Sequence, residues 1–315
     1  MPERVVTNHD WAEWVDTSDE WILQRTGIER RRFAAPDEST MTLAAAAGAS
    51  ALKDADLTPD DVDEIIVATD TPEMITPDTA ALVQDRLGCR EIVTYDLAGS
   101  GCAGFVQALD VARSRMLARP RTILVIGVEV ITRMIDQRDR ATAVLFGDGA
   151  GAVVMGPEPG RAEVLDVVAG TDGSAAGILT LAAGGTRNPF NADSLASGDY
   201  NRLVMDGRKV FVEAVRRMSE AALEVLERVG RPIADVRLVI PHQANLRIIE
   251  AVRKKLALDP ERIYVNVQEY GNIGSATVPF AMWEAVKGGR IQRGDLVVLT
   301  AFGAGFHWSA AAVQF

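Results

Sequence analysis

The chain has 315 residues, of which 48% are hydrophobic and 24% charged, and this ordinary globular composition excludes a disordered protein. A net charge of −11, from 33 Lys and Arg against 44 Asp and Glu, disfavours general binding to nucleic acid or to an anionic membrane. Two cysteines, Cys89 and Cys102, without a Cys/His cluster exclude a disulfide framework and a metal site of familiar spacing. With neither a signal peptide nor an apolar membrane span, we expect a cytoplasmic protein that does not insert into membranes.

Helices and strands alternate in the first part of the chain. Trp11, Trp14, Trp21 and Ile22 have helical spacing over 7–30, and the polar run 16–19 supplies an N-cap for a second short helix. The segment 143–155 reads as two strands that meet at 147–149. The remaining hydrophobic patterns predict helices over 41–55 and 78–87, and buried strands over 65–69, 92–97 and 122–128.

The same order restarts after a Pro/Gly-rich break at 156–161. Strands are predicted over 162–170, 238–240, 263–267, 295–301 and 308–315, and helices over 209–229, 245–256 and 275–286. This alternation indicates an α/β protein with largely parallel sheets and right-handed crossovers. We therefore expect two similar α/β halves, residues 1–161 and residues 162–315, packed against each other.

Cys102 lies in a setting typical of a nucleophile. It follows a short strand and a Gly/Ser-rich turn, and it begins a helix whose buried stripe is expected to be Phe105, Val106, Leu109 and Val111. The unpaired N–H groups and the positive end of that helix favour a thiolate over a thiol. The alternative is that Cys102 is a small buried apolar residue.

His242 and Asn272 lie at two further junctions of the same kind. His242 follows a buried strand, where α/β proteins usually carry their active sites, although a histidine at such a place is more often structural. Asn272 lies between two glycines after a strand, a position that usually marks only a turn. Cys, His and Asn together suggest acyl transfer through a thioester, with the His Nε2 and the Asn amide polarising a carbonyl. Spacing alone does not separate this chemistry from that of a papain-like hydrolase.

Ordered motifs run along nearly the whole chain. They are VDTSDEWILQRTGI at 15–28, CAGF at 102–105, FGDGAGA at 146–152, PHQANLRII at 241–249, YGNIGSA at 270–276 and FGAGFHW at 302–308. Together they resemble the beta-ketoacyl-acyl-carrier-protein synthase III family of the thiolase superfamily. The resemblance implies a thiolase-like fold with a layered αβαβα arrangement and a homodimer.

The resemblance implies a decarboxylating condensation that starts fatty acid synthesis. An acyl-CoA would acylate Cys102, and His242 with Asn272 would hold the thioester carbonyl of malonyl-acyl carrier protein while CO₂ leaves. The resulting carbanion would attack the acyl group and give a 3-oxoacyl-acyl carrier protein. The backbone N–H groups of Cys102 and Ala304 would form the oxyanion hole. No cofactor is implied, because acyl-CoA is a substrate.

The resemblance also implies the binding surfaces for the two substrates. Trp21, Arg25, Arg140 and Asn245 would bind CoA, since an aromatic plane with guanidinium groups suits stacking and phosphate pairing. Docking of the acidic carrier protein is expected on a basic cluster in an acidic chain, although such a cluster can also be only a solvated helix face. Its members are Arg247, Arg253, Lys254 and Lys255.

Several positions depart from the family pattern. The chain begins at PERVVTN, where family members have an additional N-terminal strand, so we expect an unpaired sheet edge or a misassigned start. The stretch from Asp96 to Cys102 is one residue longer than usual. Thr76 replaces a Phe that reaches the partner's acyl pocket, which leaves room for a longer or branched acyl group. His307 replaces a common Thr and is expected to be a structural replacement, and Glu73, which resembles the base of head-to-head condensing enzymes, is expected to be an exposed side chain.

Three alternatives to the condensing enzyme stay open. The first is a polyketide-pathway relative that primes an unusual starter or only transfers acyl groups, and the intact Cys102, His242 and Asn272 disfavour simple transfer. The second is a non-catalytic partner subunit, although such subunits characteristically lose the nucleophile. The third is a true thiolase, which is disfavoured because no second cysteine follows Cys102.

Overall fold

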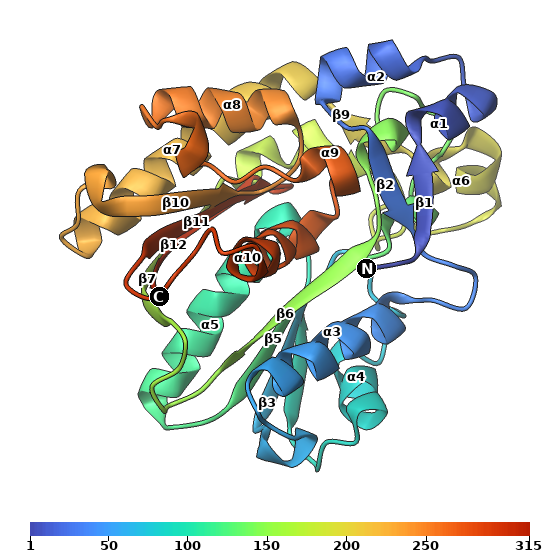
Figure 1. Ribbon diagram of the computed structural model, residues 1–315. Helices are drawn as coiled ribbons and strands as arrows, with labels where there is room; N and C mark the ends of the chain where they lie inside the picture. The colour runs from blue at the N-terminus through green and yellow to red at the C-terminus, as the bar shows by residue number, and fades with distance from the viewer.

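Two four-stranded β-sheets organise the chain in the computed structural model, which describes residues 1–315 (Figure 1). The strands are β1 (Arg4–Thr7), β2 (Arg30–Phe33), β3 (Glu64–Ala68), β4 (Val93–Leu97), β5 (Ile123–Glu129), β6 (Gly149–Met155), β7 (Glu163–Thr171), β8 (Leu179–Leu181), β9 (Leu203–Met205), β10 (Val236–Pro241), β11 (Leu296–Gly303) and β12 (His307–Gln314). The first sheet has the order β4-β3-β5-β6 and the second β10-β11-β12-β7, while β1–β2 and β8–β9 form two small ribbons. Each large sheet thus draws its strands from one part of the chain.

Helices cover both sheets and fill the space between them. They are α1 (Asn8–Trp14), α2 (Asp19–Thr26), α3 (Thr40–Asp54), α4 (Thr79–Leu87), α5 (Gly104–Ala118), α6 (Ala192–Ser197), α7 (Gly207–Arg228), α8 (Leu246–Lys255), α9 (Val267–Tyr270) and α10 (Thr277–Lys287). Helices α3 and α4 pack on the outer face of the first sheet, α7 and α8 on the outer side of the second, and α5 and α10 lie in the middle (Figure 1). This is the expected αβαβα arrangement.

The expectation of largely parallel sheets is only half right. Strand β3 pairs in parallel with β4 and β5, and β10 pairs in parallel with β11. The pairs β5–β6, β11–β12 and β12–β7 are antiparallel. The turn 304–306 between β11 and β12 is too short for a crossover, and a connection of that length forces an antiparallel hairpin. Strand β6 has one neighbour, so its other edge is unpaired.

Two predicted strands do not form. Residues Ala143–Leu145 make a 3₁₀ turn, so only the second of the two strands expected over 143–155 exists, as β6. The segment 263–267 contributes one isolated bridge, between Ile263 and Val239, and then enters α9. In both places apolar side chains are buried without a continuous ladder, and hydrophobicity alone does not distinguish a short strand from a packed turn.

The core between the two halves is shared. Phe105 and Leu109 on α5 are buried together with Ile66 of the first sheet and Val297 of the second. Val106 is buried as predicted, whereas Val111 is only partly buried. Because one hydrophobic cluster contains residues of both halves, separating the halves would expose the inner faces of both sheets.

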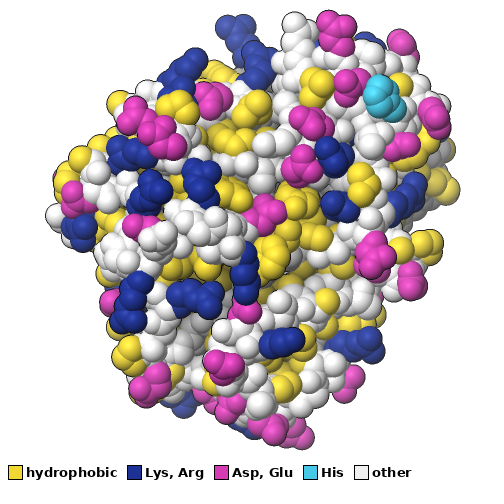
Figure 2. Space-filling view, in the orientation of Figure 1, with side chains coloured by type: hydrophobic (Ala, Val, Ile, Leu, Met, Phe, Trp, Pro, Cys, Tyr) yellow, Lys and Arg dark blue, Asp and Glu magenta, His cyan; other side chains and the backbone are white.

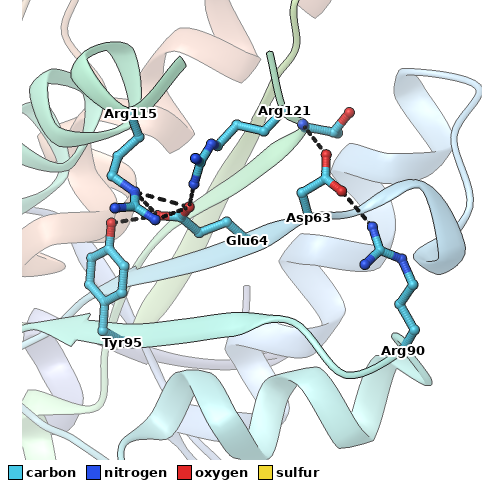
Figure 3. A network of polar contacts seen from close by, with 7 residues as sticks. Asp63, Glu64, Arg90, Tyr95, Arg115 and Arg121 are labelled. Atoms are coloured by element: carbon cyan, nitrogen blue, oxygen red, sulfur yellow. Dashed lines mark hydrogen bonds and ion pairs between the residues drawn. The ribbon is translucent and has the colours of Figure 1, made fainter. Parts of the chain in front are cut away.

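A buried carboxylate forms the centre of a polar network at the start of β3 (Figure 3). Glu64 is fully buried and accepts hydrogen bonds from Arg115 Nε at 2.8 Å, Arg121 Nη1 at 2.5 Å and the Tyr95 hydroxyl at 2.7 Å. Burial alone would raise the pKa of Glu64, but these donors outweigh it and hold the pKa below its usual value. Glu64 is therefore an anchor that ties β3 to α5 and to the start of β5.

Candidate active site

Cys102 lies in the 3₁₀ turn Gly101–Ala103, directly before α5. Two glycines allow the backbone around it to approach the turn after β11. A side chain at Gly101, which has a φ of 53°, would collide with the backbone N of Ala304, and a side chain at Gly303 would collide with the backbone N of Cys102. The two N–H groups predicted for the oxyanion hole therefore come from backbone segments in direct contact.

The thiol of Cys102 differs from the sequence-based expectation. Burial raises its pKa, and the carboxyl groups of Glu129 and Asp70, when ionised, raise it further. Hydrogen bonding to Asn272 and to the backbone acts in the opposite direction but does not compensate. The expectation that the helix N-terminus would yield a thiolate is therefore wrong for the free protein, in which desolvation dominates and Cys102 is a thiol.

Asn272 is oriented by its own backbone. Its Oδ1 accepts the Gly274 N–H at 2.9 Å and lies 3.9 Å from the Cys102 Sγ. The main chain on either side is fixed, because Gly147 N–H donates to the Asn272 carbonyl at 3.0 Å and Asn272 N–H donates to the Leu145 carbonyl at 2.8 Å. With Oδ1 engaged as an acceptor, the Nδ2 amino group is the free donor of this side chain.

His242 is buried and neutral. Burial lowers its pKa to about 3, and its backbone N–H donates to the Thr300 carbonyl at 2.8 Å. The ring Nδ1 lies 2.6 Å from the Thr277 hydroxyl, which is also 2.9 Å from the Gly274 carbonyl. Gly274 thus connects the supports of His242 and Asn272. Thr277, at the start of α10, was not singled out from the sequence, and only its place five residues after Asn272 hints at this role.

Family models match two parts of the chain. The model described as 3-oxoacyl-[acyl-carrier-protein] synthase III matches residues 95–173, and the model of the C-terminal part of the same synthase matches residues 226–315. Beta-ketoacyl-[acyl-carrier-protein] synthase III of Caldanaerobacter subterraneus is 43% identical over all of this chain and 95% of its own length. The synthase of a Roseiflexus species is 44% identical with the same coverage. The chain belongs to the beta-ketoacyl-acyl-carrier-protein synthase III family.

Solved structures agree with this assignment. The synthase III of Aquifex aeolicus has a TM-score of 0.91 and 40% identity, and the match covers 100% of this chain and 97% of that one. The priming beta-ketosynthase of the R1128 polyketide pathway has a TM-score of 0.90 and 35% identity, with 99% and 92% coverage. The protein therefore has the thiolase-like fold and is a condensing acyltransferase that catalyses the initiating condensation of fatty acid synthesis.

The residues expected at the CoA site of this synthase III gather around Trp21. The guanidinium carbon of Arg25 lies 4.6 Å from the Trp21 ring centre and that of Arg140 lies 5.2 Å from it. The side chain of Asn245, in contrast, is bonded within the protein. Its Nδ2 donates to the Arg25 carbonyl at 3.1 Å and its Oδ1 accepts the Arg247 N–H at 2.8 Å. Asn245 thus caps α8 and fastens it to the end of α2.

The basic cluster of α8 divides into two kinds of side chain. Arg247, Lys254 and Lys255 are exposed. Arg253 is largely covered and donates to Glu250 at 2.9 Å and to the Leu258 carbonyl at 2.7 Å, so it closes the helix end. Figure 2 shows Lys and Arg side chains in dark blue along the upper left of this face, over α8, with acidic side chains among them.

Three positions that depart from the family pattern have defined surroundings. Thr76 is exposed on the loop between β3 and α4. Glu73 is half-buried rather than exposed, and its Oε2 accepts the Met41 N–H at 2.8 Å at the start of α3. His307 Nδ1 lies 2.8 Å from the Thr171 hydroxyl on the neighbouring strand. The structure contains no group of three or more His, Cys, Asp and Glu side chains placed to hold a metal ion, and none of its helices is long and apolar enough to cross a membrane.

Proposed function

We propose that Cys102 carries the acyl group in this synthase III, and that His242 and Asn272 activate malonyl-acyl carrier protein. The observation that carries the proposal is the convergence of chain segments far apart in the sequence. Cys102 lies beside Asn272, and its backbone N packs against the segment that contains Ala304. Gly274 joins the supports of Asn272 and His242. The nucleophile, the two carbonyl donors and the oxyanion hole are thereby assigned to one buried site.

In the first half-reaction, Cys102 enters as a thiol and attacks the thioester carbonyl of an acyl-CoA. The developing oxyanion accepts the N–H groups of Cys102 and Ala304, which are fixed in place before the reaction begins. The Cys102 S–C bond forms and the bond between the acyl carbon and the CoA sulfur breaks. The proton that the Cys102 thiol loses ends on the CoA thiol.

In the second half-reaction, His242 and Asn272 donate to the thioester carbonyl of malonyl-acyl carrier protein. When Thr277 donates its hydroxyl hydrogen to His242 Nδ1, the neutral ring carries its hydrogen on Nε2 and can donate it. The Gly274 carbonyl also accepts the Thr277 backbone N–H, so it stays paired when the hydroxyl donates to Nδ1 instead. The two donors stabilise the enolate as CO₂ leaves, and its carbon attacks the acyl group on Cys102. The new C–C bond forms as the bond between the acyl carbon and the Cys102 sulfur breaks, and the released thiolate takes up a proton from water.

The substrate surfaces follow from the positions around the site. The adenine nucleotide of CoA stacks on Trp21, with Arg25 and Arg140 at its phosphates, and Asn245 acts through the α2–α8 junction. Arg247, Lys254 and Lys255 attract the acidic carrier protein. Arg253 supports them as a helix-end residue and makes no direct contact. The reaction needs no cofactor, because CoA leaves with the acyl transfer.

The active unit is a homodimer of two-halved protomers, with the halves dividing at residues 161 and 162. Ile75 is 86% exposed and Met74 beside it is also exposed, so the loop that carries Thr76 presents apolar surface that a second subunit would cover. In that dimer Thr76 reaches the partner's acyl pocket. Its small side chain leaves room for a longer or branched acyl group.

Intact-protein mass spectrometry tests this function. The protein is mixed with acyl-CoAs from acetyl to dodecanoyl, and malonyl-acyl carrier protein is then added. We expect one acyl adduct that is absent in Cys102→Ser and is discharged as 3-oxoacyl-acyl carrier protein, and its chain length identifies the starter. An adduct that malonyl-acyl carrier protein does not discharge contradicts condensation and favours simple transfer, and no adduct from any donor favours a non-catalytic subunit.

A second candidate within the family is a polyketide-pathway synthase that primes an unusual starter. The observation that favours it is the similarity to the R1128 priming beta-ketosynthase, which almost equals the similarity to the Aquifex enzyme in TM-score. The same acyl-CoA panel separates the two. A preference for a starter outside the short straight and branched chains favours the polyketide role.

A further inference from the structure

The peptide between Gly101 and Cys102 has two hydrogen-bonding ends with different surroundings. Its N–H belongs to Cys102 and is the proposed oxyanion donor. Its carbonyl, on Gly101, is buried and lies 3.1 Å from the hydroxyl of Ser275, in the 3₁₀ turn Gly274–Ala276 before α10. The same hydroxyl lies 3.1 Å from Glu129 Oε1, at the end of β5. Ser275 therefore stands between a backbone carbonyl and a carboxyl group.

Hydrogen-bond accounting decides the state of this chain of groups. A serine hydroxyl has one hydrogen, so Ser275 donates either to Gly101 or to Glu129, but not to both. If Glu129 is ionised, it is the stronger acceptor and takes the hydrogen, which leaves the buried Gly101 carbonyl with the Gly104 N–H as its donor. If Glu129 is protonated, it donates to Ser275, and Ser275 donates to Gly101. Only the protonated form gives the Gly101 carbonyl the Ser275 hydroxyl as a donor in addition to the Gly104 N–H.

The surroundings of Glu129 favour the protonated form. Its side chain is 1% exposed, and burial together with the nearby Asp70 carboxylate raises its pKa to about 8. Oε2 accepts the Thr71 hydroxyl at 2.7 Å, and Oε1 lies 3.1 Å from both the Asp70 N and the Ser275 hydroxyl, so Oε1 is the oxygen that carries the hydrogen donated to Ser275.

The titratable groups that act on Glu129 are Asp70, from the loop after β3, and Cys102. Asp70 in turn faces His307 of β12. The adjacent strand β6 and the turn Gly274–Ala276 carry no titratable side chain. On the other two neighbouring elements, Glu64 of β3 pairs with Arg115 of α5, and Arg113 of α5 pairs with Asp166. The charged groups that act on Asp110 of α5 are Arg113, Asp166 and Arg228, not Glu129.

We propose that Glu129 and Ser275 are positioning residues that polarise the Gly101–Cys102 peptide and so strengthen the oxyanion-hole N–H of Cys102. Hydrogen bonds in a chain polarise one another, by about 10–30% per bond, and a donor to a peptide carbonyl makes the N–H of the same peptide a better donor. No group is transferred permanently, because each hydrogen stays within its own contact. The inference rests on the proposed role of Cys102 in acylation.

The hydrogen-bonded groups Glu129, Ser275 and the Gly101 carbonyl make the acylation rate depend on pH in one predicted direction. Below the pKa of Glu129 the carboxyl is protonated and the Gly101 carbonyl keeps the Ser275 donor. As pH rises through about 8, Glu129 ionises, draws the Ser275 hydrogen away and leaves the Cys102 N–H weaker. In Glu129→Gln the amide donates to Ser275 at every pH. The ratio of wild-type to Glu129→Gln acylation rates should therefore be level below this pH and fall above it.

Three variants and two readouts test the inference. Acylation of Cys102 by the preferred acyl-CoA is followed by rapid-quench mass spectrometry across the pH range, and the thioester carbonyl stretch of the acyl-enzyme, isotope-labelled at the carbonyl carbon, is recorded by infrared difference spectroscopy. In Ser275→Ala we expect acylation to slow by about tenfold, less than the 10²–10³-fold cost of losing a whole oxyanion donor. Its carbonyl stretch should move to higher frequency, and Glu129→Gln should retain more activity than Ser275→Ala. Asp70→Asn removes a negative neighbour of Glu129, so the acylation rate should begin to fall at a lower pH than in the wild type.

The outcomes separate this inference from the proposed function. If the wild type forms no adduct, the proposed function fails first. If it forms the adduct but Ser275→Ala leaves both the acylation rate and the carbonyl frequency unchanged, the polarising role is overturned while the function stands. A pH dependence that is identical in wild type and Glu129→Gln also overturns it. Thermal unfolding of each variant shows whether a loss of acylation activity comes from misfolding. Where it does, the carbonyl frequency of the folded fraction decides whether the polarising role holds.

Discussion

The direction in which the Thr277 hydroxyl donates its hydrogen decides which ring nitrogen of His242 can donate in turn. The hydroxyl lies within hydrogen-bonding distance of both the His242 Nδ1 and the Gly274 carbonyl. The ring is neutral at physiological pH, because burial lowers its pKa to about 3. A neutral imidazole donates through Nε2 only when Nδ1 accepts, so a Thr277 hydroxyl that donates to Nδ1 would select the form that the proposed decarboxylating step needs.

Thr277→Val tests this selection at the residue scale. We expect CO₂ release from malonyl-acyl carrier protein to fall by about 10²-fold, because His242 no longer has a donor at Nδ1. Acylation of Cys102, measured by mass spectrometry, should change little. Thr277→Ser keeps the hydroxyl and is the matched control, and His242→Ala gives the lower limit of decarboxylation. Equal losses in both half-reactions would contradict the assigned division of roles.

Cys102 and Asn272 could be located from the sequence because glycines mark the sharp turns that hold them. The state of the thiol could not, because its pKa depends on Glu129 and Asp70, which approach only in the folded chain. Ser275 lies within the YGNIGSA motif and Thr277 directly follows it, yet their roles depend on which carbonyl and which ring they face. The sequence holds one feature that could have pointed to Glu129, namely an acidic residue at the end of an otherwise apolar strand.

At the element scale, the residues that hold α8 in place differ from those that are exposed to a partner. Asn245 and Arg253 make hydrogen bonds that hold its two ends. Arg247 and Lys254 are exposed and seven residues apart, which places them on one face of the helix. The face is therefore free to meet a partner, whereas the ends are not.

Charge reversal on this face tests carrier-protein docking. In Arg247→Glu with Lys254→Glu we expect the KM for malonyl-acyl carrier protein to rise by about tenfold or more and to depend less on salt, because favourable long-range attraction becomes repulsion. The KM for acyl-CoA and the acylation rate should stay near the wild-type values. Arg237→Glu with Arg293→Glu, at two exposed arginines outside α8, lowers the net charge by the same amount and is the charge-matched control. Equal effects from both variants would indicate only a change in net charge.

Elements with strong periodicity could be predicted from the sequence, and irregular apolar segments could not. The long helix α7 and the buried strand β5 lie within two residues of their predicted bounds. The segments 143–145 and 263–267 are equally apolar but form a 3₁₀ turn and an isolated bridge. Their conformation is set by what packs over them, such as the bridge from Phe146 to Asn272 that supports the site.

For the whole molecule, Glu64 is a fully buried charge at the start of β3, outside the candidate active site. In Glu64→Gln, Arg121 keeps its buried position but loses its counter-charge, and we expect unfolding free energy measured with urea at neutral pH to fall by about 3 kcal/mol. Arg90→Ala, which breaks the exposed Asp63–Arg90 pair in the same region (Figure 3), should cost less than about 1 kcal/mol. A Glu64→Gln cost no larger than that of Arg90→Ala would contradict the anchoring role.

This stabilisation has a predictable pH dependence. The folded-state pKa of Glu64 is lowered, so its contribution is fully present above the unfolded-state pKa of about 4.3 and is lost as pH falls through the folded value. The gap between wild type and Glu64→Gln should therefore be constant near neutral pH and shrink in acid. Urea unfolding followed at several pH values measures this gap, and a gap that widened in acid would mean that the folded-state pKa of Glu64 is raised rather than lowered.

The shared core between the halves has a consequence for how this enzyme loses activity. Because the proposed nucleophile lies before residue 161 and the proposed carbonyl donors lie after it, a local opening that loosens the contact between α5 and the second sheet would separate them before either sheet unfolds. Activity should fade at a lower temperature than the circular-dichroism signal of the helices. Occupancy by an acyl-CoA, which favours the assembled form, should bring the two transitions together. The catalytic centre therefore also reports whether the two halves are properly docked.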